Sequence, residues 1–224
     1  MTEPPFTRPL RRRVFLQICG TTAAGVVIAG CGDDDGEDAA TGTTPEQADV
    51  TLDFSQLAGV LNYAYALEQL EAAFYTQARE TVAKPTESEY GRVIDALKGH
   101  EIAHREFFKE VLGKDAVGAL EVNFSKIDFD DQENVLEVAS TFENLGVGAY
   151  NGAAKYLARM GKQAAVPLMA AGDIVSVEAR HASVINDLAG KSFAPDGFDE
   201  ALEPAAVLEA AAPYLKTTVR VMNA

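Results

Sequence analysis

Cysteine, histidine and positive charge are all scarce in this sequence. Its 224 residues include two Cys, three His and no Trp, with 19 Lys plus Arg against 34 Asp plus Glu, which gives a formal net charge of −15. Two Cys exclude a disulfide scaffold and a zinc site built on thiolates. The acidic excess argues against nucleic acid or an anionic membrane surface as a partner, because both need clustered cations. With 47% hydrophobic residues, the chain is globular and has one well-filled core.

A long apolar run is also missing. The run of mostly small and apolar residues from Val14 to Gly30 is too short and too weakly apolar for a bilayer span. A basic stretch, residues 8–13, precedes this run, and Cys31 follows it. This order of parts predicts an export signal over residues 1–30 that is removed from the mature protein together with Cys19.

Two short motifs support the export signal. Two Arg followed by a Phe-Leu pair resemble the twin-arginine export motif, at Arg12, Arg13, Phe15 and Leu16. Residues 28–31 (IAGC) resemble the lipobox of bacterial-type lipoproteins, in which cleavage leaves the Cys as an acylated first residue. The resemblance implies an exported protein anchored to the cell envelope membrane by lipid on Cys31. The alternative is a basic start with a lone structural Cys.

The segment that follows Cys31 is acidic, rich in Gly and Thr, and almost free of large apolar side chains. Such a stretch cannot bury enough surface to order itself. We therefore expect residues 31–52 to form a flexible tether between the lipid and a folded domain. A calcium-binding acidic loop is the alternative interpretation.

Hydrophobic periodicity predicts four long helices in the rest of the chain. They run from about Phe54 to before Pro85, from Ser88 to Gly113, from Asp131 to Gly161, and from Pro167 to Gly190. The second connection is long, whereas the first and third are short. This pattern predicts an all-α four-helix bundle over residues 53–190 with one long crossover between helices two and three. Residues 191–224 should add a loop and a short C-terminal helix, between Leu202 and Leu215, packed on the outside.

The apolar stripe of every predicted helix is interrupted by carboxylates. The residues are Glu68 on the first helix, Glu101 with His104 on the second, Glu143 on the third, and Glu178 with His181 on the fourth. Ionised groups in a core must be paired, protonated or bound to cations, because burying them alone is costly. Two divalent cations would neutralise four carboxylates. The sequence therefore predicts a two-metal site.

The spacing of these residues supports the same hypothesis. A Glu-x-x-His motif places a carboxylate and an imidazole on adjacent turns of one helix face, so that both can reach one metal. The motif occurs twice, at 101–104 and at 178–181. Each unpaired Glu is followed seven residues later by a Tyr, Tyr75 and Tyr150. The two halves look like one helical hairpin used twice, related by a pseudo-twofold axis through the metal pair.

The order Glu, Glu-x-x-His, Glu, Glu-x-x-His on four helices resembles the ligand set of ferritin-like di-iron and di-manganese carboxylate proteins. Residues 61–75 (LNYAYALEQLEAAFY) and 176–185 (SVEARHASVI) further resemble an exported branch of that family that includes desiccation-related proteins. The resemblance covers about Phe54 to Leu188.

The resemblance also implies a role for each residue. Glu101 and Glu178 would bridge the two metals, Glu68 and Glu143 would be terminal ligands, and each His of the two motifs would bind one metal. A set of oxygen and imidazole ligands suits iron or manganese and argues against copper(I).

Four further residues lie close to this pattern. Tyr75 and Tyr150 would hold carboxylates in place by hydrogen bonds. Glu71 lies on the same stripe, but its counterpart in the second half is Gly146. Glu71 could be an extra ligand, an ion-pair partner or a polar group on the upper face of the site. His100 lies off the stripe and is expected to face solvent.

Two classes of function are compatible with these features. The resemblance implies an oxidoreductase, a ferroxidase or a peroxide-removing enzyme, in which a reduced metal pair reacts with oxygen or peroxide. The alternative is a non-catalytic structural or stress-protective envelope lipoprotein in which the metal stabilises a scaffold. A storage cage is a third interpretation, less favoured because a lipid on every N-terminus would have to lie outside the shell. A homo-oligomer is compatible with all three.

Overall fold

The computed structural model describes residues 48–82 and 87–224. The predicted export signal, Cys31 and the tether up to residue 47 lie outside the described residues, as does Pro85. Among the helices of the described part, none combines the length and the apolar character that crossing a membrane requires.

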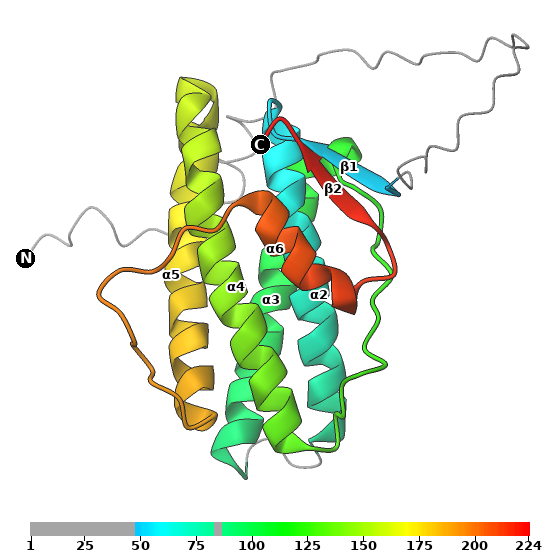
Figure 1. Ribbon diagram of the computed structural model, residues 1–224, viewed down its shortest axis with the longest axis vertical. Coiled ribbons are helices and arrows are strands. Elements are labelled where there is room, and N and C mark those ends of the chain that lie inside the picture. The colour runs from blue at the N-terminus through cyan, green and yellow to red at the C-terminus, as the bar shows by residue number, and fades with distance from the viewer. Residues whose placement is uncertain (1–47, 83–86) are drawn as a thin grey trace, which may run out of the picture. The chain divides into compact units, whose positions relative to one another are not determined.

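Four long helices form the body of the domain (Figure 1). They are α2 (Leu57–Thr81), α3 (Glu89–Leu112), α4 (Gln132–Arg159) and α5 (Ala165–Leu188). Helix α2 packs most extensively on α3, and α4 packs most extensively on α5. The two resulting hairpins meet through contacts of α2 with α4 and of α3 with α5. The predicted bundle with a long crossover between its second and third helices is confirmed.

Local sequence signals explain where the helices begin and end. The side chain of Ser88 accepts a hydrogen bond from the backbone N–H of Gly91 at 2.9 Å, and Asp131 accepts one from the N–H of Glu133 at 3.0 Å. Both are N-caps that satisfy donors of the first turn. Helix α3 stops at Gly113, whose φ of 55° is unfavourable for residues with a Cβ.

The beginning and end of the described domain meet in a two-stranded parallel sheet that the sequence did not predict. Strand β1 (Val50–Asp53) pairs with β2 (Val219–Met222), with Val50 opposite Val219. Leu52 is 2% exposed. The predicted tether of residues 31–52 is therefore wrong for residues 50–52, which belong to the fold. A four-residue strand is too short for periodicity to reveal, and its partner lies far along the chain.

The C-terminal segment packs on α4. The predicted helix between Leu202 and Leu215 is shorter in the structure, where α6 covers Pro204–Ala211 and a 3₁₀ turn follows. Leu202 precedes α6, and its N–H donates to the carbonyl of Gly148 at 2.9 Å. A Cβ at Gly152 would lie 1.7 Å from the carbonyl oxygen of Leu202. The two glycines thus form the notch that receives this segment on the outside of the bundle.

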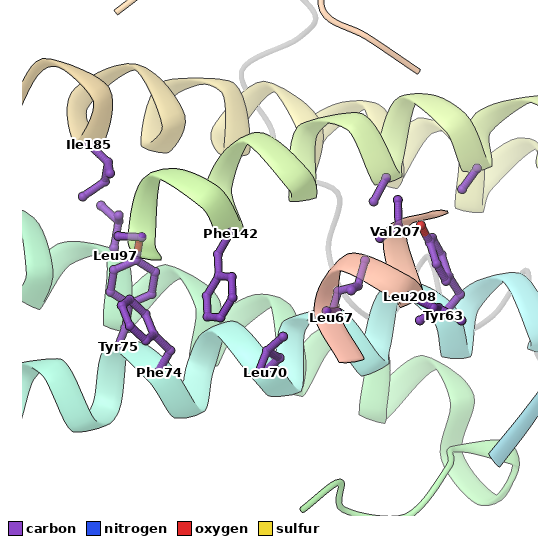
Figure 2. Packing of buried hydrophobic residues seen from close by; sticks show 14 of the residues in the cluster. Tyr63, Leu67, Leu70, Phe74, Tyr75, Leu97, Phe142, Ile185, Val207 and Leu208 are labelled. Carbon is purple, nitrogen blue, oxygen red and sulfur yellow. The ribbon is translucent and has the colours of Figure 1, made fainter. Parts of the chain in front are cut away.

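Aromatic and aliphatic side chains fill the space between the helices (Figure 2). Phe74 of α2 and Phe142 of α4 point toward one another, with ring centroids 5.1 Å apart and planes at 75°. Leu70 and Leu97 are also fully or almost fully buried. This packing lies directly beside the polar residues of the predicted site.

Candidate metal centre

Each long helix contributes one buried carboxylate to the interior of the bundle. All four have a relative exposure of 0%: Glu68, Glu101, Glu143 and Glu178. Along α3, Leu97 lies one turn before Glu101 and Phe108 lies one turn after His104, and both apolar residues are 3% exposed. The carboxylates therefore form a polar layer with apolar packing on either side.

The structure brings the six predicted ligand residues together in two overlapping groups. One group is Glu68, Glu101, His104 and Glu178, and the other is Glu101, Glu143, Glu178 and His181. Within each group, one ligand atom per residue lies within 4.8 Å of the others. Glu101 and Glu178 belong to both groups, which is the placement required of carboxylates shared by two metals.

His104 directs Nδ1 at three carboxylates of its group. The distances from Nδ1 are 3.0 Å to Oε1 of Glu178, 3.3 Å to Oε2 of Glu101 and 3.4 Å to Oε2 of Glu68. Because the three oxygens come from three different helices, this nitrogen lies where α2, α3 and α5 meet.

His181 occupies the corresponding position in the second group. Its Nδ1 lies 2.9 Å from Oε1 of Glu101, 3.4 Å from Oε2 of Glu143 and 3.7 Å from Oε2 of Glu178. This nitrogen is buried and has no aligned hydrogen-bond partner. Nδ1 of His181 therefore faces the space between the carboxylates, where it could bind a metal once its proton is displaced.

Several other buried atoms at the centre also lack hydrogen-bond partners. They are one oxygen each of Glu68, Glu101 and Glu143 and both oxygens of Glu178. Buried polar atoms without partners are strongly disfavoured unless something else satisfies them. Inward-facing carboxylate oxygens and imidazole nitrogens form a donor set that divalent cations satisfy. The residues present therefore fit a pair of divalent metal ions.

Two tyrosines fix the unshared carboxylates from the opposite hairpin. The hydroxyl of Tyr75 on α2 donates to Oε1 of Glu143 on α4 at 2.5 Å. The hydroxyl of Tyr150 on α4 donates to Oε1 of Glu68 on α2. The contacts are reciprocal, which agrees with the pseudo-twofold relation between the hairpins. In each case one carboxylate oxygen is held by the tyrosine while the other faces the centre.

Comparison with known families agrees with this arrangement. The sequence profile of a ferritin-like domain matches residues 56–191. The chain belongs to the ferritin-like domain family. The matched segment of this ferritin-like chain contains all six predicted ligand residues and both tyrosines, whereas α6 and both strands lie outside it. None of the curated proteins compared with the chain matches it.

The buried charges of the ferritin-like centre shift one another's pKa values. Burial, together with the charges of Glu101 and Glu178, raises the pKa of Glu143 to about 8. Burial alone would raise the pKa of Glu101, but His104 and His181 outweigh it and lower that pKa to about 2. Burial alone would lower the pKa of both histidines, but the surrounding carboxylates raise each to about 12. Protons and positive charge are therefore held tightly at this centre.

Glu71 lies beside the ferritin-like centre, outside both ligand groups. It is 4% exposed, and burial and then the charge of Glu178 raise its pKa well above the usual range, which favours a neutral carboxyl group. A Cβ at position 146 would lie 3.2 Å from Oε1 of Glu71, so Gly146 leaves the space that the Glu71 side chain occupies. Within the described chain, no ion pair involves Glu71. Its role as an extra ligand stays a prediction.

His100 is exposed, in agreement with the prediction, but it also makes a contact that the prediction missed. Its Nδ1 lies 2.8 Å from Nε2 of His181. The two rings are nearly parallel, with planes at 9° and centroids 5.1 Å apart. The prediction missed this contact because it assigned residues to faces of single helices. The contact between α3 and α5 brings His100 over the neighbouring helix, and a His directly before a Glu-x-x-His motif is the signal that was available.

A cavity of about 600 Å³ lies over the histidine side of the ferritin-like centre, between α3 and α5. Its lining includes all three histidines, with Val177 and the exposed side chains of Arg92 and Arg180. Glu89 also lines it, but none of the four carboxylates of the centre does. A small molecule in this cavity would reach the outer edges of the imidazole rings first.

The pKa values predict how stability depends on pH in protein stripped of metal with a chelator. The proton on Glu143, with a pKa of about 8 against 4.5, contributes stability that is present below pH 4.5 and lost through pH 8. Protonated His104 and His181, with pKa values of about 12 against 6.5, contribute stability that is lost progressively above pH 6.5. The melting temperature should therefore fall by several degrees from mildly acidic to mildly alkaline pH.

Bound metal replaces these protons, so stabilisation by metal should depend on pH in the opposite sense to stabilisation by protons. The increase in melting temperature on metal loading should become larger as the pH rises, and calorimetry of both forms across the same pH series measures it. An increase that is constant with pH would contradict this account of the centre.

Proposed function

We propose that this ferritin-like protein binds two divalent metal ions, iron or manganese, within the four-helix bundle. The observation that carries the proposal is the pair of overlapping ligand groups with inward-facing, unsatisfied oxygen and nitrogen atoms. Glu101 and Glu178 would be shared by both metals. Glu68 with His104 would complete one site, and Glu143 with His181 the other. The oxygen and imidazole donors favour iron or manganese over softer metals.

We further propose a redox activity toward oxygen or peroxide, either as a ferroxidase or as a peroxide-removing oxidoreductase. Reduced iron or manganese supplies the electrons for such chemistry when it is bound. The chain's own residues offset the charge of the metals with four carboxylates, and Tyr75 and Tyr150 hold two of those carboxylates in orientation. The apolar residues on either side of the polar layer keep bulk water out. The cavity between α3 and α5 is the route we propose for a small oxidant.

One observation favours a non-catalytic alternative. All four carboxylates are completely buried, and only the histidines among the proposed ligands line the cavity. In that case the metal would act as a stability element of an envelope protein with a structural or stress-protective role, as in the desiccation-related branch that the sequence resembles. The consumption of oxidant separates the two functions.

We also propose that the protein is exported and held at the envelope membrane by lipid on Cys31. The support is the twin-arginine pattern with Arg12, Arg13, Phe15 and Leu16, and the lipobox pattern that ends at Cys31. Asp49, directly before β1, is hydrogen-bonded to Thr218, so residues 32–48 would separate the lipid from the domain. Twin-arginine export would carry the bundle across the membrane already folded, with its metals in place.

Metal analysis tests the two-metal centre. Mature protein loaded anaerobically with ferrous iron should retain two metal ions per chain after gel filtration, and the Glu143→Ala variant should retain about one. The matched control is Glu137→Ala, because Glu137 lies on the same helix but is exposed and pairs with Lys191 at the surface. This control should retain two metals. Fewer than two metals per chain in the unaltered protein would refute the proposed centre.

The Glu101→Gln variant distinguishes catalysis from a structural role. The substitution keeps the size of the side chain but removes a charge that both metals would share. Consumption of oxygen or peroxide should fall by at least about tenfold, while circular dichroism still reports a folded bundle. Glu137→Gln serves as the control and should keep full activity. Undiminished activity of the Glu101→Gln variant would favour the structural alternative.

Cell fractionation tests the lipid anchor. The unaltered protein should be recovered with the membranes, and the Cys31→Ala variant should lose this association because no acylated residue remains. Cys19→Ala is the matched control, since Cys19 lies within the part of the signal that cleavage would remove. Membrane association that survives the Cys31 substitution would contradict the proposed anchor.

A further inference from the structure

The two halves of the centre differ at the position that precedes each Glu-x-x-His motif. The carboxylates, the histidines and the tyrosines all have counterparts in the other hairpin. His100 comes directly before Glu101, and the residue in the corresponding place of the second motif is Val177. Both residues line the same cavity. The difference therefore concerns what the outer edge of each ligand histidine can contact.

His181 has a polar neighbour at both ring nitrogens. Its Nδ1 faces the carboxylates of Glu101 and Glu143, and its Nε2 lies 2.8 Å from Nδ1 of His100. The two rings lie in nearly parallel planes and meet edge to edge through these nitrogens, which is the orientation that an N–H···N hydrogen bond requires. For His104, only Nδ1 has polar partners: within residues 48–82 and 87–224, its Nε2 takes part in no hydrogen bond or ion pair. Of the two ligand histidines, only His181 therefore has a polar partner at the ring nitrogen that faces away from the carboxylates.

The chemistry of imidazole gives this contact a consequence. A neutral imidazole carries one proton, and the nitrogen that binds a metal must be the one without it. If Nδ1 of His181 binds metal, its proton is on Nε2 and needs an acceptor, which Nδ1 of His100 provides. An outer partner of this kind fixes the tautomer and orientation of a ligand histidine and raises metal affinity.

We propose that His100 is a positioning residue for His181, and that it makes the metal position at Glu143 and His181 tighter than the one at Glu68 and His104. The inference rests on the proposed two-metal function and adds that the two positions differ in metal affinity. His100 itself contacts no metal. It acts through the hydrogen bond to Nε2 of His181.

Stepwise metal affinity tests this inference. Purified full-length protein, stripped of metal, is titrated anaerobically with cobalt(II), whose visible absorption reports the ligands of each bound ion. The unaltered protein should bind two ions with unequal affinity. His100→Val, which installs the residue of the other half, should weaken the tighter step by about 10–100-fold and change its spectrum, while the second step stays in place.

Two further variants separate positioning from packing. His100→Asn keeps an acceptor oxygen near Nε2 of His181 and should recover most of the affinity. Val177→Ala alters the counterpart position in the same cavity and should leave both steps unchanged. The metal-free forms of all variants should melt close to the unaltered protein, because both sites border the cavity and not the apolar core.

The possible failures are distinguishable. If the unaltered protein binds no metal, the proposed function and this inference both fail. If it binds two ions and His100→Val leaves both steps unchanged, only the inference is wrong. An Asn variant as weak as the Val variant would also overturn it, because the loss would then come from the missing imidazole ring and not from the missing hydrogen-bond acceptor.

Discussion

The burial of four carboxylates in one layer of the bundle is the constraint on which the rest of the structure depends. Each such ion would cost several kcal/mol if it stood alone in the interior. The chain compensates with two histidines whose pKa values rise to about 12 and with a Glu143 whose pKa rises to about 8. The layer therefore exists only with bound protons or bound cations. Two divalent ions would satisfy the buried carboxylate oxygens and the imidazole nitrogen that still lack a hydrogen-bond partner.

The same layer joins the two hairpins. Tyr75 of α2 reaches Glu143 of α4, and Tyr150 of α4 reaches Glu68 of α2, so each hairpin supplies the hydrogen bond that orients a carboxylate of the other. The ligand set is therefore complete only where the two hairpins pack together. Any ion that binds between the carboxylates also links the hairpins, which couples metal affinity to folding stability.

The parts of this structure that the sequence predicts are those governed by one helix at a time. A repeated stripe reveals which residues of α2 to α5 face inward, and the capping residues Ser88 and Asp131 mark where two helices begin. The parts it misses depend on contacts between distant segments. Strand β1 is stabilised by β2 at the other end of the chain. His100 reaches His181 only because α3 packs on α5. Periodicity carries no information about either contact.

The polar residues that break the twofold symmetry lie in the same hairpin. Glu71 and His100, the two polar additions, both lie in the first hairpin, and their counterparts in the second are Gly146 and Val177. Gly146 leaves the room in which the Glu71 side chain lies, and Val177 leaves the outer edge of one histidine without a polar partner. A duplicated hairpin with identical surroundings would give two equal metal positions, and hence no preferred order of filling. Because the additions fall on one side, the proposed ligand set stays symmetric while its surroundings do not, and the two positions would differ in affinity without any change in the ligands themselves.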